Sequence, residues 1–262
     1  MSRPILEVRR LSMEFGGIRA LSLLDLDVRA GEIVALIGPN GAGKTTFFNC
    51  VTGIYNPTGG DILLNPHGRE TVRLNGLKPN RVTEQGLART FQNIRLFQNM
   101  TVLENVMIGR HCRTSSFIAG AIFRPASTRR EERETVERSY EILEKVGLAE
   151  QVNEFAKNLP YGAQRRLEIA RALATEPFLL LLDEPAAGMN PQETGELDAL
   201  IKQIRDEGHA ILLIEHDMKL VMSLSDRIFV MDYGKKIAEG SPAEVSANPD
   251  VIRAYLGEEA DA

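Results

Sequence analysis

One short glycine-rich segment has the residue types and spacing of a phosphate-binding loop. The segment fits Gly-x-x-x-x-Gly-Lys-Thr and consists of Gly38, Pro39, Asn40, Gly41, Ala42, Gly43, Lys44 and Thr45, with Thr46 following it. Glycines let backbone N–H groups turn inward around phosphates, and a lysine in this place reaches the β- and γ-phosphates. We therefore predict that these nine residues bind a nucleoside triphosphate such as ATP, with the Thr45 hydroxyl holding Mg²⁺.

Two carboxylates come directly after an apolar run further along the chain. The run 178–182 reads Phe-Leu-Leu-Leu-Leu, and Asp183 and Glu184 follow it. Ligands of an α/β sheet bind at the carboxyl ends of its strands. Beside a phosphate loop, Asp183 would coordinate Mg²⁺ and Glu184 would polarise the attacking water as a general base. Taken alone, the pair would fit an ordinary strand end equally well.

The elements that position these groups are indicated by the hydrophobic pattern. The runs 33–37, 178–182 and 210–214 are apolar throughout, which is typical of parallel strands buried on both faces. Before position 30 the chain alternates apolar and polar residues, as in antiparallel strands that expose one face to solvent. We predict an α/β fold with a mainly parallel sheet and an N-terminal antiparallel β subdomain.

A long charged stretch separates the two halves of this predicted core. Residues 103–157 show helical periodicity without a buried strand, and 129–134 is typical of a solvated helix start. We interpret this stretch as an inserted helical subdomain. Within it, 110–128 is expected to be a loop or short helices at the surface, and nearer the N-terminus 65–81 is expected to be an extended hairpin or loop.

Composition excludes several classes of protein. The 262 residues are 43% hydrophobic and 26% charged, which is ordinary for a globular protein. The longest apolar runs, such as 117–123, fall far short of the roughly 20 residues that cross a bilayer, and no secretion signal is visible, so we expect a cytosolic protein. Cys50 and Cys112 fit reduced thiols, and the net charge of −5 argues against a nucleic-acid partner.

The segment 158–173 resembles the signature of the ATP-binding cassette (ABC) family, which reads Leu-Ser-Gly-Gly-Gln-Gln followed by a basic helix. Here the signature begins Leu-Pro-Tyr-Gly-Ala-Gln, so Pro160, Tyr161 and Ala163 stand where Ser, Gly and Gln are usual. The resemblance implies that the signature of one subunit meets the phosphate loop of another across bound ATP. The residues implied in that contact are Tyr161, Gly162, Ala163 and Gln164.

Other positions resemble the same family. Phe15 matches the aromatic residue that stacks on adenine, Gln92 the glutamine that touches Mg²⁺ and the attacking water, and His216 the histidine that bonds the γ-phosphate. Asn190 stands where an aspartate is commoner. The resemblance implies one nucleotide-binding domain over 1–262, with a catalytic core at about 1–92 and 176–262 and a helical subdomain at about 93–175.

Longer stretches at 184–191, 215–222 and 248–258 resemble the larger ATPase of high-affinity branched-chain amino-acid importers. This implies a smaller sister ATPase in a heterodimer (a homodimer being the alternative), two membrane permeases and, indirectly, an extracytoplasmic solute-binding protein. The resemblance implies that the protein lies at the cytoplasmic face of a bacterial inner membrane. ATP hydrolysis would then be coupled to the membrane subunits through a groove beside Gln92 and the segment 97–104. Urea or amide uptake, lipopolysaccharide export and a soluble non-transport cassette stay open as alternatives.

Overall fold

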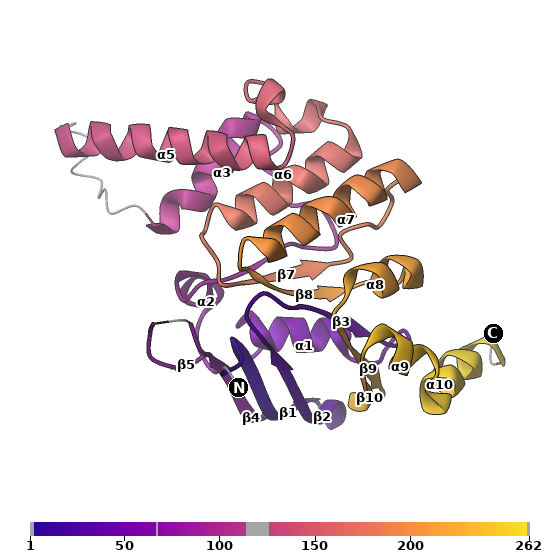
Figure 1. Ribbon diagram of the computed structural model, residues 1–262. Helices are drawn as coiled ribbons and strands as arrows, with labels where there is room; N and C mark the ends of the chain where they lie inside the picture. Colours follow the sequence, from indigo (N-terminus) through magenta and orange to yellow (C-terminus); the bar gives the residue numbers. More distant parts are fainter. Residues whose placement is uncertain (1–2, 67, 114–125, 261–262) are drawn as a thin grey trace.

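A six-stranded sheet forms the centre of the computed structural model, which describes residues 3–66, 68–113 and 126–260 (Figure 1). Neighbours from β9 to β6 are parallel, and only β10 runs antiparallel to its neighbour. In spatial order the strands are β10 (Lys235–Gly240), β9 (Arg227–Asp232), β3 (Ile33–Ile37), β8 (Ala210–Ile214), β7 (Leu179–Asp183) and β6 (Leu87–Arg89). The mainly parallel sheet is confirmed, and the predicted strands 33–37 and 210–214 match β3 and β8.

A four-stranded antiparallel sheet flanks this core; β1 and β2 precede β3 in the chain, and β4 and β5 follow it. Its spatial order is β2 (Ile18–Val28), β1 (Leu6–Phe15), β4 (Gly59–Leu64) and β5 (Val72–Arg73). The long pair β1 and β2 is bulged, and non-glycine residues near the bulges, Arg10 and Leu23, have φ of 48° and 51°. The antiparallel β subdomain that the alternating pattern predicted is therefore confirmed.

Helices cover both faces of the large sheet, as Figure 1 shows. Helix α1 lies between the two sheets, and α7 lies between the large sheet and α6. The helices of the described residues are α1 (Lys44–Val51), α2 (Pro79–Glu84), α3 (Val102–Arg110), α5 (Ala126–Lys145), α6 (Tyr161–Leu173), α7 (Pro191–Asp206), α8 (Met218–Leu224), α9 (Pro242–Ser246) and α10 (Pro249–Ala260). None of the helices in these described ranges is long and apolar enough to cross a membrane.

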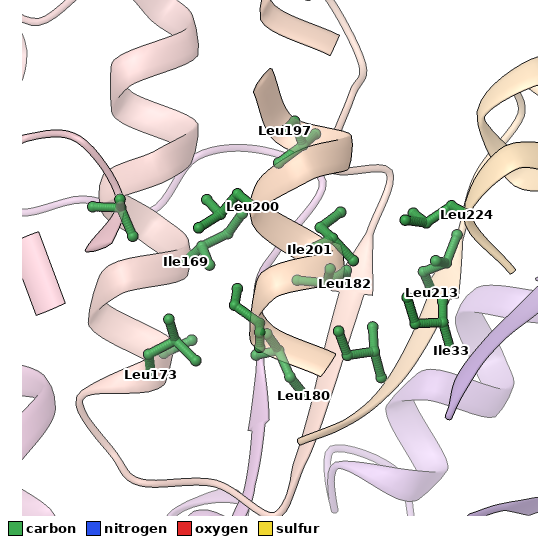
Figure 2. Packing of buried hydrophobic residues seen from close by; sticks show 14 of the residues in the cluster. Ile33, Ile169, Leu173, Leu180, Leu182, Leu197, Leu200, Ile201, Leu213 and Leu224 are labelled. Atoms are coloured by element: carbon green, nitrogen blue, oxygen red, sulfur yellow. The ribbon is translucent and has the colours of Figure 1, made fainter. Parts of the chain in front are cut away.

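The central strands are apolar throughout because alternate residues enter two different cores. Leu180 and Leu182 of β7 pack with α6 and α7, where Ile169 and Ile201 meet them (Figure 2). The intervening residues of the same strand face α1 and the antiparallel sheet. Successive side chains of a strand point to opposite faces, so a strand covered on both sides buries every residue.

The inserted stretch is helical, as predicted. Helix α3 begins one residue before this stretch, at Val102, and α5 lies within it, beginning at Ala126, three residues before the expected start at 129. The described residues here also form three short 3₁₀ turns, the last of which ends at Asn158. Of the expected surface loop 110–128, residues 114–125 lie outside the described ones, as does the apolar run 117–123. The expected hairpin or loop at 65–81 contains the short β5, and its last three residues already belong to α2.

Candidate functional site

The predicted phosphate loop joins β3 to α1. Gly38 and Gly43 have φ of 150° and 100°, and a Cβ at Gly38 would lie 2.0 Å from the Met231 carbonyl oxygen. Only glycine fits so close an approach. Lys44 is buried at the start of α1, and its Nζ donates to the carbonyl oxygens of Gly38 (2.5 Å) and Pro39 (2.8 Å). The loop therefore curls around the ammonium group that was predicted to reach the phosphates.

A pocket of about 650 Å³ lies against this loop. Residues 39–42 form one wall, and the other walls come from the turn between β9 and β10 and from α10. Thr45 is exposed and Thr46 half-buried on the first turn of α1. The exposed N–H groups of such a helix start favour a bound phosphate.

Phe15 lies at the exposed end of β1. Its ring is 40% exposed and packs edge-on against Tyr55, with 5.2 Å between the ring centroids. Its cross-strand partner Ile18 is 74% exposed. Sequence reasoning singled out Phe15 but missed Tyr55 and Ile18, which extend the apolar surface at this strand end.

The three predicted catalytic residues converge. Oε2 of Glu184 accepts a hydrogen bond from Gln92 Nε2 (2.9 Å), and its Oε1 lies 2.9 Å from His216 Nε2. The three residues follow the neighbouring strands β6, β7 and β8, whose carboxyl ends meet at one edge of the sheet. Glu184 adopts φ of 48°, and its N–H donates to the Ile214 carbonyl. A left-handed non-glycine residue is strained, and such strain is concentrated at functional sites.

Asp183 is held by an arginine that sequence reasoning missed. Nη2 of Arg89 lies 2.6 Å from Asp183 Oδ2, and both side chains are almost completely buried. Nη1 of Arg89 donates to Asn49 Oδ1 of α1 at 2.7 Å. Because β6 and β7 are adjacent, Arg89 at the end of one strand neutralises the carboxylate at the end of the other. No local sequence signal connects these positions, which lie 94 residues apart.

A second missed residue, Glu215, links the loops after β7 and β8. Its carboxylate accepts from the backbone N–H groups of Ala186 (2.8 Å) and His216 (3.1 Å). Burial raises the pKa of Glu215, and these N–H donors oppose that rise. The carboxylate thereby fixes the loop of Glu184 relative to His216. A carboxylate directly after an apolar strand was the available signal, the same one that drew attention to Asp183.

The signature segment forms the start of α6. Pro160 is the N-cap of this helix, and its side chain makes no capping hydrogen bond. Tyr161 is exposed, whereas Gly162 and Ala163 are buried. Since the side chain of Ala163 has no polar group, only its backbone could bind a ligand. The Gln164 side chain donates back to the Leu159 carbonyl at 2.9 Å. The pocket at the phosphate loop has no lining residue from this segment.

Asn190 caps α7, which explains why it replaces the commoner aspartate without loss of structure. Its Oδ1 accepts from the Glu193 N–H, and the Glu193 carboxylate accepts from the Asn190 N–H, each at 3.0 Å. Asparagine and aspartate are equally good N-caps. A Cβ at Gly162 would lie 2.5 Å from Glu193 Oε1, so the signature helix packs closely on this cap.

The remaining histidines and the cysteines lie apart from these groups. Nδ1 of His209 lies 2.8 Å from the Pro177 carbonyl oxygen, His111 lies in the turn after α3, and His67 is outside the described residues. Both cysteines are free: Cys50 is buried, which raises the pKa of its thiol to about 11, and Cys112 is exposed.

A phosphate loop, a strand-end acid pair and three converging polar side chains on a mainly parallel sheet define a P-loop ATPase. More specifically, the chain belongs to the ABC transporter family, whose pattern matches residues 21–187. A second family pattern, described as branched-chain amino acid ATP-binding cassette transporter, matches residues 235–261. The chain is thus an ATP-hydrolysing subunit whose activity is coupled to transport.

Named relatives and solved structures agree with this assignment. The chain is 51% identical to the high-affinity branched-chain amino acid transport ATP-binding protein LivG of Escherichia coli K12 over 98% of its length and 100% of the relative's. Identity is also 51% to BraF of Pseudomonas aeruginosa, which carries the same description. The ADP conformation of the ABC transporter cassette MJ1267 superposes with a TM-score of 0.84 at 31% identity, covering 98% of this chain and 100% of that one.

Proposed function

We propose that this chain hydrolyses ATP to drive the import of branched-chain amino acids across a bacterial inner membrane, at whose cytoplasmic face it lies. The observation that carries the proposal is the 51% identity to LivG and BraF over their full lengths. Its partners are a sister ATPase, two permeases and, indirectly, an extracytoplasmic binding protein. Nucleic acid has no part in this activity.

The chemistry assigned to the site follows from its contacts. The Glu184 carboxylate takes a proton from water as the water oxygen attacks the γ-phosphorus, and the bond to ADP breaks. Gln92 and His216 each contact one oxygen of that carboxylate, so both orient the base. Lys44 donates to the β- and γ-phosphates, Phe15 stacks on adenine, and together they hold the nucleotide in place.

The residues placed near the phosphates suit Mg²⁺. The candidate ligands are the Thr45 hydroxyl, the Asp183 carboxylate and the Gln92 amide oxygen, all of them hard oxygen donors. One carboxylate with hydroxyl and phosphate oxygens is the donor set that Mg²⁺ prefers. Asp183 is buried beside Arg89, whose guanidinium pairs with that carboxylate and holds it in position. The ion would neutralise charge that develops on the phosphates.

The signature completes the site from a second subunit. Gly162 and Ala163 present backbone N–H groups at the start of α6, and Tyr161 is exposed beside them. Gln164 follows, and its N–H donates to the Pro160 carbonyl. Helix starts favour anions. We assign these four residues to the γ-phosphate of ATP bound by the partner, so that ATP joins two cassettes and hydrolysis separates them.

Pro160 offers a direct test of this signature assignment. Proline supplies neither a hydroxyl nor an N–H. In Pro160→Ser, a hydroxyl at the N-cap would stabilise α6 by about 1 kcal/mol and would add a phosphate contact of about 1.5 to 3 kcal/mol. We expect ATP-driven dimerisation to tighten about tenfold, measured by analytical ultracentrifugation with and without ATP. A variant with raised thermal stability but unchanged dimerisation would contradict a phosphate contact at this position.

A groove on the helical side suits the membrane partner. Its volume is about 820 Å³, and it is lined by residues of α2, β6, the segment after Gln92, α3 and α6. Phe91 and Phe97 give it apolar walls, and Arg95 lies over the Phe91 ring at 4.2 Å. We assign the groove to a cytoplasmic segment of a permease, because it adjoins the backbone that carries Gln92.

The two cysteines allow this groove to be tested. Cys112 lines it and is exposed, whereas Cys50 is buried with a pKa of about 11. The thiolate is the reactive form. We expect a maleimide to label the isolated chain once, at Cys112, and to label the assembled transporter at least about tenfold more slowly. Equal labelling rates in the two samples, measured by mass spectrometry, would contradict the assignment of this groove to a permease.

Co-purification tests the proposed function as a whole. Membrane complexes isolated through a tag on this chain should contain a second ATPase and two permeases, and the associated binding protein should retain leucine, isoleucine or valine. A binding protein that retains urea or an amide, or a complex that extracts lipopolysaccharide, would replace the amino-acid assignment and leave the ATPase in place.

A further inference from the structure

A buried arginine on α6 holds the backbone at Gln92. The Arg165 side chain is only 3% exposed. Its Nη1 donates to the Phe91 carbonyl at 2.7 Å, and its Nη2 donates to the Gln92 carbonyl. Two consecutive carbonyls bound by one planar fork fix the direction of the chain there. The Gln92 side chain reaches Glu184 from this fixed point.

The same arginine also contacts Tyr161, one turn earlier on α6. The Tyr161 hydroxyl accepts from Arg165 Nη2 at 3.0 Å, and the guanidinium lies 5.5 Å from the ring centroid. The ring packs against Gly188, where an added Cβ would lie 3.2 Å from a ring carbon. Gly188 belongs to the loop that follows Glu184, so Tyr161 connects that loop to Arg165.

Glu168 neutralises this arrangement from the next turn of α6. Its side chain is 2% exposed, with Oε2 3.4 Å from Arg165 Nη1 and Oε1 accepting from the Arg95 N–H at 3.3 Å. A buried charge is tolerated when it is paired and hydrogen-bonded. Glu168 therefore pairs with Arg165 and also binds the backbone of the same segment, at Arg95. It thereby helps to keep Arg165 on the Phe91 and Gln92 carbonyls.

We propose that Tyr161 and Arg165 are positioning residues that act on the hydrolysis site through Gln92. Their contacts close a circuit: from Glu184 through the Gln92 amide to the backbone, then through Arg165 and Tyr161 to Gly188, and back along the chain. The proposal rests on the proposed function of Glu184 and Gln92. A glycine at position 161, the usual residue in the family, has neither the ring nor the hydroxyl, so this link depends on the tyrosine.

The test is a double-mutant cycle between Tyr161→Phe and Gln92→Ala, measured on the full-length protein. Tyr161→Phe keeps the ring against Gly188 and removes only the hydroxyl. We expect kcat for ATP to fall about five- to tenfold with KM changed less than about twofold, and the same change in the Gln92→Ala background to lower kcat less than about twofold. An equal fall in both backgrounds would overturn the proposal, because the hydroxyl would then act on something other than Gln92.

Hydrogen exchange supplies a readout that does not depend on turnover. We expect Tyr161→Phe and Arg165→Lys to speed amide exchange several-fold in peptides covering 90–96, with no change in α7. The matched control is Arg166→Lys, since Arg166 is the next residue on α6 and pairs instead with Glu196 at 2.6 Å. Exchange at 90–96 that is unchanged in both variants would also overturn the proposal. If Glu184→Gln hydrolysed ATP at the wild-type rate, the role proposed for Glu184 would fail instead, which is a separate outcome.

Discussion

Replacement of Glu184 by Gln is expected to lower ATP turnover by about 10²- to 10⁴-fold, the contribution usual for a positioned general base. The amide keeps the size of the side chain between Gln92 and His216 but cannot accept the proton of the attacking water. ATP affinity should stay within about twofold, because the role proposed for Glu184 is to act on the attacking water, whereas anchoring of the phosphates is assigned to Lys44 and its loop. Phosphate release and equilibrium ATP binding, measured on the same preparations, check both statements.

An ATP-bound dimer should therefore accumulate in Glu184→Gln, visible as a shift in size-exclusion chromatography with Mg²⁺ and ATP. Glu196→Gln is the matched control, since Glu196 is a partly exposed carboxylate on α7 that pairs with Arg166. Turnover at the wild-type rate in Glu184→Gln would remove Glu184 from the role of base.

Replacement of Lys44 by Ala should act on binding instead. The ammonium is buried in the curl of the phosphate loop, donating to the carbonyls of Gly38 and Pro39. We propose that this positive charge meets the β- and γ-phosphates of ATP. A hydrogen bond to a charged group contributes about 1.5 to 3 kcal/mol, so we expect ATP affinity to fall by a factor of about 10 to 100.

Calorimetric titration with ATP measures this loss, and Lys202→Ala on α7, where Lys202 pairs with Asp198, is the control for removal of a lysine. Unchanged affinity for ATP would contradict the assignment of this loop to phosphate binding.

Local patterns made the central strands and the phosphate loop predictable. The apolar runs 33–37 and 210–214 are strands buried on both faces, and the glycines at 38 and 43 take up backbone conformations that few other residues adopt. The edge strand β6 is only three residues long and has no such pattern. It could not be recognised, although it positions both Arg89 and Gln92.

Contacts between residues far apart in the chain could not be predicted from the sequence. Arg165 and Phe91 are 74 positions apart, and Arg89 and Asp183 are 94 apart. Nothing in the local composition around Arg165 distinguishes it from Arg166, yet one is buried against the Gln92 segment and the other pairs at the surface of α7. Burial of a charge is decided by the packing of α6 on its neighbours, which a helical pattern does not specify.

The central claim is that ATP hydrolysis by this chain drives uptake of branched-chain amino acids. Uptake of labelled leucine into proteoliposomes that hold the assembled importer, its binding protein and enclosed ATP tests it most directly. We predict leucine accumulation with the wild-type chain and a fall of at least about tenfold with Glu184→Gln, at equal amounts of assembled complex. Accumulation at the wild-type level with Glu184→Gln, or uptake of other solutes in place of leucine, isoleucine and valine, would contradict the claim.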